Sequence, residues 1–534
     1  MMMNTQLTVA PMLERAEKYF SKKEVVSRTF DQMHRLTYKE VGRRTRALSS
    51  ALEKLGVRRG ERVGTFAWNH HRHLEAYFGV PGMGGVLHMI NIRLPKEHLV
   101  HVINHAEDQV LLIDEDLLPL IENVKDQLTS VHTFIVMTDK DELPANSFEV
   151  VYSYEKLIRE GDDSYLFLQD IDENEPAAMC YTSATTGKPK GVVYSHRGIA
   201  LHSLSQGLTD STGVSEEDVV MPVVPMFHAN AWGMPYTATW FGTTQVLPGP
   251  NFTPKLLAEL IQNEKVTMTA GVPTIWLGLL QELEQEVYDT SSLRAVICGG
   301  SAAPKGMIQK FERDFNVPFI HAYGLTETTP LVTLARLKSY QKKLAEDDRL
   351  DIRASQGMAV PGIDIKVMNE TGEVEWNGED MGELLIRGPW IADQYHNDER
   401  SKEAFQDGWL HTGDVVTVDE EGSIKIVDRT KDLIKSGGEW ISSVELENAI
   451  MAHDAVKEAA VVAVADEKWQ ERPVACVVVK ETYQASTLKN EIIEFLKPQF
   501  AKWWLPDEVI FMDEIPKTSV GKFLKRALRE KVQQ

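Results

Sequence analysis

Residues 181–191, with the sequence YTSATTGKPKG, combine the groups that bind a polyphosphate. Glycine leaves backbone N–H groups accessible, hydroxyl side chains donate hydrogen bonds, and lysine ammonium groups supply positive charge. The stretch is not a Walker loop, because Pro189 follows Gly187-Lys188 where that loop needs Ser or Thr. A polar hairpin turn is the ordinary explanation of a Ser/Thr/Gly stretch. This stretch is longer and more particular than such a turn, so we predict a phosphate site.

The charge of the chain restricts where an anionic ligand can bind. The 534 residues carry 57 Lys and Arg against 79 Asp and Glu, a formal net charge of −22, which argues against a nucleic-acid partner. An acidic protein also repels nucleotides and carboxylates at long range. A site for either must therefore gather cations locally, and two segments are basic enough to do so: residues 188–197 and 516–531.

The surrounding sequence alternates between helix and strand patterns. Residues 37–40 form a capping box that begins a helix, and Gly56 ends it. Residues 62–68 predict a strand, and residues 293–304 predict a short buried strand, a glycine turn and the start of a helix. This alternation indicates a mostly parallel sheet covered by helices, in which sites lie at the carboxyl ends of the strands.

The pattern changes from about residue 360. Short strands with turns follow and predict a small β-rich region, and a compact segment of mixed helices and strands comes after it. We place a domain boundary near Asp428. This gives an N-terminal domain of residues 1–427 and a C-terminal domain of residues 428–534.

Five segments, in order along the chain, resemble the signatures of the adenylate-forming superfamily of acyl- and aryl-CoA synthetases, luciferases and adenylation domains. They are residues 181–191, AYGLTET (322–328), GWLHTGD (408–414), DRTKDLIKSGGEWIS (428–442) and PKTSVGK (516–522). The resemblance implies an α/β fold: a large N-terminal domain of helix-covered sheets with a small β-barrel region, and a small mobile α+β C-terminal domain. It also implies that ATP activates a carboxylic acid as its acyl-adenylate, from which the acyl group passes to a thiol.

The resemblance also implies which residues bind ATP and Mg²⁺. Glu327 would be a Mg²⁺ ligand together with Thr186, because Mg²⁺ accepts one carboxylate plus phosphate oxygens and water. Tyr323 would stack on adenine, and Asp414 and Arg429 would contact the ribose. The other residues that the resemblance places at the nucleotide are Thr182, Ser183, Ala184, Thr185, Gly187, Lys190, Gly300, Ser301, Ala302, His321, Ala322, Gly324 and Thr326.

The last two segments imply a catalytic lysine and a coenzyme A site. Lys522 follows a glycine in a polar loop and resembles the family's catalytic lysine, which neutralises charge in the adenylation transition state. Lys431 resembles the hinge about which the small domain rotates between the half-reactions. Lys435 and Ser436-Gly437-Gly438 would then line the thiol channel for coenzyme A, and Trp440 is a further cofactor-binding residue.

One residue departs from the family pattern. Glycine usually stands where this chain has Ala184. If the position needs a positive φ, alanine is strained there by roughly 1 kcal/mol, and its methyl group could also crowd a phosphate.

The acid itself is indicated by a further resemblance, to bacterial medium- and long-chain fatty acyl-CoA synthetases. In PMFHANAWGMPY (225–236), His228 and Trp232 resemble an aromatic gate of the acyl pocket, with His228 a candidate catalytic residue. Gly300 and Gly324 would border the same pocket. We expect a medium- or long-chain fatty acid as substrate, and a short substituted acid such as methylthiopropionate is the alternative.

Other functions remain possible at this point: a carrier-protein adenylation module, a luciferase-like oxidase and a non-catalytic nucleotide-binding relative. The chain ends soon after Lys522 with no carrier domain, which favours a free thiol acceptor. Ala184 is the one feature that favours a non-catalytic relative, whereas Glu327, Asp414 and Lys522 oppose it.

Two further clusters favour structural roles. Residues 69–73, NHHRH, lack the i, i+4 spacing of a helical metal site and predict a polar strand-to-helix turn. Trp503-Trp504 predicts packing of the small domain rather than a cofactor platform. Three scattered cysteines, with no signal-peptide or membrane-span pattern, predict a cytoplasmic protein. The resemblance to bacterial enzymes implies a homodimer.

Overall fold

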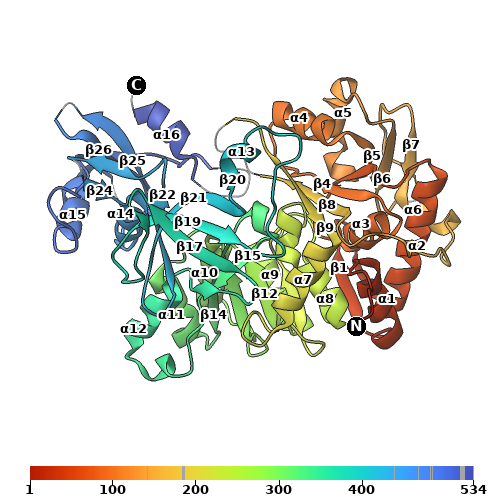
Figure 1. Ribbon diagram of the computed structural model, residues 1–534, viewed down its shortest axis with the longest axis horizontal. Coiled ribbons are helices and arrows are strands. Elements are labelled where there is room, and N and C mark those ends of the chain that lie inside the picture. Colours follow the sequence, from red (N-terminus) through yellow and green to blue (C-terminus); the bar gives the residue numbers. More distant parts are fainter. Residues whose placement is uncertain are drawn as a thin grey trace.

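The computed structural model describes every residue except 141, 183–186, 438, 467, 481–482, 484, 518–522 and 533–534. Two predicted functional segments therefore lie partly outside the described residues. They are the phosphate loop at Ser183, Ala184, Thr185 and Thr186, and the loop that carries Lys522. Figure 1 shows the N-terminal part of the chain, in red to yellow, and the C-terminal part, in blue, at opposite sides of the molecule.

A seven-stranded sheet is built from the first 195 residues. It is parallel except for β9, which runs antiparallel to β8. Its strands, in spatial order, are β7 (Val151–Ser153), β6 (Thr133–Met137), β5 (Asp108–Asp114), β3 (Arg62–Phe66), β4 (Val86–Met89), β8 (Pro176–Tyr181) and β9 (Gly191–Ser195). The helices of this part are α1 (Ala10–Tyr19), α2 (Tyr38–Lys54), α3 (His71–Gly82), α4 (Lys96–Ala106), α5 (Leu118–Glu122) and α6 (Tyr154–Glu160).

A nine-stranded sheet follows, and its six central strands are parallel. In spatial order the strands are β16 (Met358–Ala359), β15 (Leu331–Leu334), β14 (Phe319–Gly324), β13 (Ala295–Cys298), β12 (Met268–Gly271), β10 (Val219–Pro222), β11 (Thr244–Leu247), β1 (Glu24–Arg28) and β2 (Met33–Thr37). One face buries an apolar cluster with α9 (Pro254–Glu264), α10 (Pro273–Gln285) and α11 (Lys305–Asp314). The two sheets are joined by α7 (His196–Gly207), which packs on β8 and β9, and α8 (Met234–Phe241), which packs on β10 and β11.

The predicted β-rich region is a six-stranded antiparallel sheet that shares an apolar cluster with the nine-stranded sheet. Its strands are β18 (Gly372–Glu373), β17 (Asp364–Asn369), β19 (Gly382–Arg387), β21 (Trp409–Val418) and β20 (Phe405–Gln406), with β22 (Ile424–Arg429) also paired to β21. A short helix, α12 (Glu346–Ala354), precedes this sheet and packs on α11 and β14, and α13 (Ser401–Ala404) lies between β19 and β20.

The C-terminal part has a five-stranded sheet with a separate core. Its strands are β24 (Glu439–Ile441), β23 (Ile434–Ser436), β26 (Gln470–Val479), β25 (Val456–Asp466) and β27 (Glu508–Phe511). One apolar cluster packs it against α14 (Ser443–Met451) and α15 (Ala485–Leu496), and another against α16 (Lys525–Val532). The N-terminal apolar clusters end at Ile426 and the C-terminal ones begin at Ile434, so the two sets of clusters are separate in sequence.

Local sequence signals account for much of this architecture. Thr37 Oγ1 accepts from Glu40 N, and Glu40 Oε2 accepts from Thr37 N at 2.8 Å, so the predicted capping box forms. Gly56, which follows α2, has a φ of +96°. The side chain of His70 accepts from His73 N and caps the start of α3, so residues 69–70 form the turn after β3 and residues 71–73 begin the helix. None of the described helices has both the length and the apolar character needed to span a bilayer.

Candidate active site

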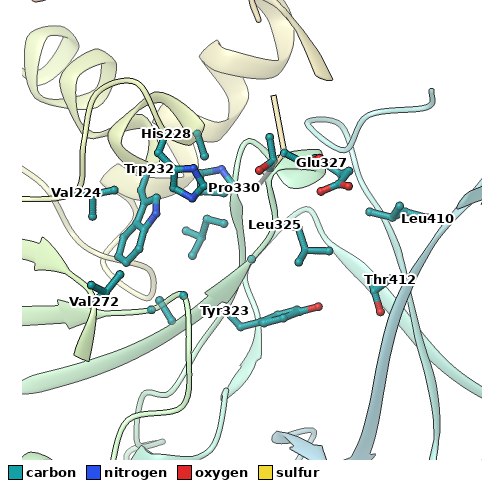
Figure 2. A pocket seen from close by; sticks show the side chains of 18 of the residues that line it. Val224, His228, Trp232, Val272, Tyr323, Leu325, Glu327, Pro330, Leu410 and Thr412 are labelled. Carbon is teal, nitrogen blue, oxygen red and sulfur yellow. The ribbon is translucent and has the colours of Figure 1, made fainter. Parts of the chain in front are cut away.

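A cavity of about 680 Å³ lies where the carboxyl ends of the nine-stranded sheet meet the six-stranded sheet. Its lining includes residues that directly follow β10, β12, β13 and β14, which is where sites in parallel sheets occur. In Figure 2, Val224, Val272 and Trp232 lie at one side of the cavity, and Glu327, Leu410 and Thr412 lie at the other.

Positive charge is concentrated around this cavity, although the chain is acidic. Among the described residues, six Lys and Arg line it against three carboxylates: Arg93, Lys188, Lys190, Arg400, Arg429 and Lys431 against Glu327, Glu383 and Glu403. Lys188 and Lys190 come from the basic segment predicted at residues 188–197. No described residue of segment 516–531 lines the cavity.

One end of the cavity is apolar. Its lining includes Val223, Val224, Met234, Phe252, Val272, Ile275, Ile297, Leu331 and Leu334. The Trp232 indole packs across the backbone of Gly299, where an added Cβ would lie 3.1 Å from Cη2. Gln206 holds the backbone of Trp232, because its Nε2 donates to Trp232 O at 2.8 Å. This end accommodates an alkyl or aryl group.

Trp232 lies on an unusual turn. Residues 229–233 have successive φ values of 44°, 55°, 48°, 57° and 74°, and only Gly233 among them is glycine. His228 precedes the turn and lines the cavity with Trp232. L-residues avoid this left-handed conformation at a cost of roughly 1–2 kcal/mol each. The surrounding packing therefore determines the position of the indole.

Gly324 and Gly300 border the cavity, and the local structure explains why each of these positions is a glycine. A Cβ on Gly324 would lie 1.6 Å from Pro330 O, so no side chain fits there. Gly300 has a φ of +85°, which suits glycine. Both glycines line the cavity.

Glu327 lies at the polar end, on a short 3₁₀ turn (Thr326–Thr328) that follows β14. Its Oε1 accepts a hydrogen bond from Tyr395 OH at 2.6 Å and lies 3.9 Å from Lys190 Nζ. Tyr194 OH donates to Thr326 O at 2.8 Å and secures the turn. Burial, reinforced by the Glu327 carboxylate, raises the pKa of Tyr395, whereas burial lowers the pKa of Lys190. Tyr395 is therefore a neutral hydrogen-bond donor.

Asp414 is buried and held by two residues that line the cavity. Its Oδ2 accepts from Tyr323 OH at 2.6 Å, and its Oδ1 lies 3.3 Å from Arg429 Nε. The Asp414 carboxylate raises the pKa of Arg429, and burial raises the pKa of Tyr323. Strand β14 thus supplies the tyrosine, β21 the aspartate and β22 the arginine.

The other predicted residues divide into three groups. Thr182, Ala322, Thr326 and Lys431 line the cavity. Ser301, Ala302, His321 and Gly187 lie near it without lining it; the Nδ1 of His321 lies 2.7 Å from Ser355 O. Lys435 and Trp440 lie apart from the cavity on β23 and β24, with Lys435 Nζ 5.2 Å from the centre of the Trp440 ring.

Sequence reasoning missed several residues at this site. Tyr395 contacts Glu327 and Lys190, Arg400 Nη1 donates to Lys188 O at 3.1 Å, and Gln206 holds the Trp232 backbone. These residues lie in helices or loops outside the recognisable segments and reach the site only through the fold.

A cation-rich cavity at the strand ends, with an apolar extension and a Tyr–Asp–Arg cluster, has the chemistry suited to a nucleotide and an organic acid. The chain belongs to the AMP-binding enzyme family. The family model described as AMP-binding enzyme matches residues 13–396, and the AMP-binding enzyme C-terminal domain matches residues 445–522.

Curated relatives match along almost the whole chain. A long-chain-fatty-acid–CoA ligase from Thermus thermophilus is 49% identical over 99% of this chain and 96% of its own length. A medium-chain-fatty-acid–CoA ligase from Ectopseudomonas oleovorans is 43% identical over 99% and 97%. A 3-methylmercaptopropionyl-CoA ligase from Ruegeria lacuscaerulensis is 42% identical over 99% and 98%. Among solved structures, an anthranilate CoA ligase in complex with anthranoyl-AMP superposes with a TM-score of 0.88 at 25% identity, covering 99% of this chain and 98% of the other.

Proposed function

We propose that this protein is an ATP-dependent acyl-CoA synthetase that converts a medium- or long-chain fatty acid to its acyl-CoA through an acyl-adenylate, releasing pyrophosphate and AMP. The observation that carries the proposal is a single cavity with an apolar end beside Trp232 and a cation-rich end beside Glu327. The two ends suit the two parts of an acyl-adenylate. The names of two relatives, a long-chain and a medium-chain fatty-acid–CoA ligase, agree with this activity.

The chemistry explains why both ends are needed. A carboxylate is a poor acyl donor because oxide would have to leave. Its oxygen instead attacks the α-phosphorus of ATP and expels pyrophosphate, which leaves a mixed anhydride. A thiol then attacks the carbonyl carbon, and AMP departs with the oxygen that came from the acid. Fixed cations stabilise the negative charge that develops during the first step. We assign this role to Lys190 and to Lys522, which lies outside the described residues.

Mg²⁺ fits the polar end of the cavity by the chemistry of its donors. The ion prefers one or two carboxylates completed by phosphate oxygens and water, and Glu327 places one carboxylate beside the phosphate-loop residue Lys190. We assign Glu327 and Thr186 to hold it. When bound there, it would neutralise phosphate charge during adenylation.

The remaining assignments follow the same geometry. Tyr323 contacts adenine, Asp414 and Arg429 bind the ribose, and the phosphate loop from Thr182 to Lys190 binds the phosphates. Asp414 is suited to accept hydrogen bonds from sugar hydroxyls because it is an ionisable carboxylate held in place by two partners.

Coenzyme A transfer requires a second arrangement of the C-terminal domain. Lys435 and Trp440 lie apart from the cavity in this arrangement, whereas Lys431 lines it. We propose that residues 428–534 rotate about Lys431 after adenylation, which withdraws Lys522 and brings Lys435 and Trp440 towards the acyl-adenylate. The separate apolar core of this part supports rotation as a unit.

The apolar lining favours an alkyl chain as the acyl group, and Trp232 and His228 line the same cavity. A short substituted acid such as methylmercaptopropionate remains the second candidate, because a relative with that name matches nearly as well as the medium-chain ligase. We further propose a cytoplasmic homodimer. The homodimer rests on the resemblance to bacterial synthetases, and the cytoplasmic location rests on three buried cysteines that form no disulfide. Light scattering of the purified chain would test the dimer.

Pyrophosphate release across a panel of straight-chain acids and methylmercaptopropionate, with and without coenzyme A, tests the function. We expect release that depends on acid and is accelerated by coenzyme A, with a maximum at one chain length. A maximum at methylmercaptopropionate would favour the second candidate. If none of the acids in the panel caused pyrophosphate release, the proposal would be contradicted.

A further inference from the structure

Tyr395 bridges the two charged groups at the polar end of the cavity. Its hydroxyl donates to Glu327 Oε1 at 2.6 Å and accepts from Lys190 Nζ at 2.7 Å. An ammonium group only donates and an ionised carboxylate only accepts, so the direction of both hydrogen bonds is fixed. Lys190 Nζ also lies 4.0 Å from the centre of the Tyr395 ring. One buried side chain therefore holds the lysine through its hydroxyl and its ring.

The bridge keeps the two charges apart. Lys190 Nζ and Glu327 Oε1 are 3.9 Å apart, whereas a direct charge-assisted hydrogen bond would bring them to about 2.8 Å. In a direct hydrogen-bonded ion pair, the charge of the Glu327 carboxylate, which we assign to the metal, would be neutralised by the Lys190 ammonium, which we assign to a phosphate. The phenol hydrogen-bonds both groups and holds them beyond direct hydrogen-bond distance, so neither is bonded directly to the other.

The segment that carries Tyr395 is attached to the phosphate loop by other contacts. His396 N donates to Gly191 O at 2.8 Å, and Arg400 Nη1 donates to Lys188 O at 3.1 Å. Tyr395 N donates to Ser401 Oγ at 2.9 Å. None of these bonds uses the phenol hydroxyl. Replacing Tyr395 by phenylalanine therefore removes the bridge and leaves the ring and the segment in place.

We infer that Tyr395 is a positioning residue for adenylation, which holds Glu327 and Lys190 apart so that each meets a different part of a metal–ATP complex. The inference rests on the proposed function. It concerns only the first half-reaction, because transfer of the acyl group from the adenylate to a thiol breaks no bond between phosphates.

Tyr395→Phe in the full chain tests the inference, and the protein contains a matched control. On the surface, Tyr340 OH also donates to a carboxylate, that of Glu421, and Lys338 Nζ donates to the same carboxylate at 2.7 Å. Tyr340→Phe therefore removes a phenol hydroxyl that donates to a carboxylate beside a lysine, but in a trio where the lysine contacts the carboxylate directly and away from the cavity. Three quantities are measured for each variant: the Kd of Mn²⁺·ATP by titration calorimetry without acid, pyrophosphate release, and thioester formation from supplied acyl-adenylate.

We expect Tyr395→Phe to raise the Kd of Mn²⁺·ATP by about tenfold to a hundredfold, the usual effect of losing a hydrogen bond to a charged group. Pyrophosphate release should slow at low ATP, and thioester formation from the adenylate should stay within about twofold. Tyr340→Phe should match the wild type in all three. An unchanged Kd, an equal loss in both half-reactions, or the same losses in Tyr340→Phe would each overturn the inference. If the wild type bound Mn²⁺·ATP but released no pyrophosphate with any acid, the proposed function would fail, and the binding comparison would still decide the role of Tyr395.

Discussion

The contact between Tyr323 and Asp414 makes a quantitative prediction about nucleotide binding. Asp414 is buried, and its Oδ2 accepts from Tyr323 OH at 2.6 Å. If this carboxylate binds the ribose, Asp414→Asn removes charge-assisted hydrogen bonds worth about 1.5–3 kcal/mol and weakens AMP binding by about tenfold to a hundredfold. The ion pair with Arg429 adds little, about 1 kcal/mol at most, because the arginine side chain is 39% exposed.

Tyr323→Phe should act through Asp414. The phenylalanine ring can still stack on adenine, so the variant loses only the hydrogen bond that orients the carboxylate, which is worth about 1 kcal/mol or roughly fivefold in the Kd of AMP. Once Asp414 is replaced, the Tyr323 hydroxyl has no carboxylate left to orient. The double variant should therefore bind AMP about as well as Asp414→Asn alone, which is a coupling energy of about 1 kcal/mol.

Titration calorimetry of AMP with the wild type, both single variants and the double variant measures this coupling. Tyr288→Phe is the control, because it removes a phenol that donates to a carboxylate, that of Glu282, at the same distance of 2.6 Å but away from the cavity. Effects that add to within about 0.3 kcal/mol would refute the reasoning. So would an unchanged Kd of AMP in Asp414→Asn.

Three further predictions follow from other contacts. A Cβ on Gly299 would lie 2.9 Å from Ala322 O and 3.1 Å from the Trp232 indole. Gly299→Ala should therefore narrow the apolar end of the cavity, lower the free energy of unfolding by about 1–3 kcal/mol and reduce kcat/KM most for the longest acids. An equal reduction of kcat/KM at every chain length would contradict this prediction. Burial lowers the pKa of His202 from 6.5 to about 3. As the pH falls below 6.5, the imidazole is protonated in the unfolded chain before it is protonated in the folded one. The folded state therefore loses stability in that pH window, by about 2 kcal/mol at pH 5. His202→Gln should lessen the fall in the free energy of unfolding between pH 7 and pH 5 by that amount, measured by urea denaturation, and an unaltered fall would show that His202 does not contribute. Lys522→Ala should abolish adenylation but leave thioester formation from supplied acyl-adenylate largely intact, whereas equal loss of both steps would contradict the rotation of the C-terminal domain.

Much of the fold could be predicted because its signals are local. The capping box at Thr37 and Glu40 begins α2 as expected, and residues 293–304 form the predicted strand, glycine turn and helix start. The change from helix–strand alternation to short strands near residue 360 coincides with the six-stranded sheet. Signals of this kind depend on neighbours in the sequence, so one chain is enough to recognise them.

The site was only partly predictable, because several of its contacts join distant parts of the chain. Lys190 and Tyr395 are 205 residues apart and touch only because β9 and the loop after β19 meet at the cavity. The left-handed turn at residues 229–233 has a single glycine, so its sequence does not predict positive φ values. The turn depends instead on tertiary contacts such as that of Gln206 with Trp232 O.

The most direct test of the central claim follows the oxygen of the acid. The enzyme is incubated with ATP, Mg²⁺, coenzyme A and a fatty acid labelled with ¹⁸O in its carboxylate. The ¹⁸O content of AMP and pyrophosphate is then measured by mass spectrometry. Attack of the carboxylate on the α-phosphorus predicts AMP that carries one ¹⁸O atom and pyrophosphate that carries none. Unlabelled AMP, or ADP with label in inorganic phosphate, would contradict activation through an acyl-adenylate.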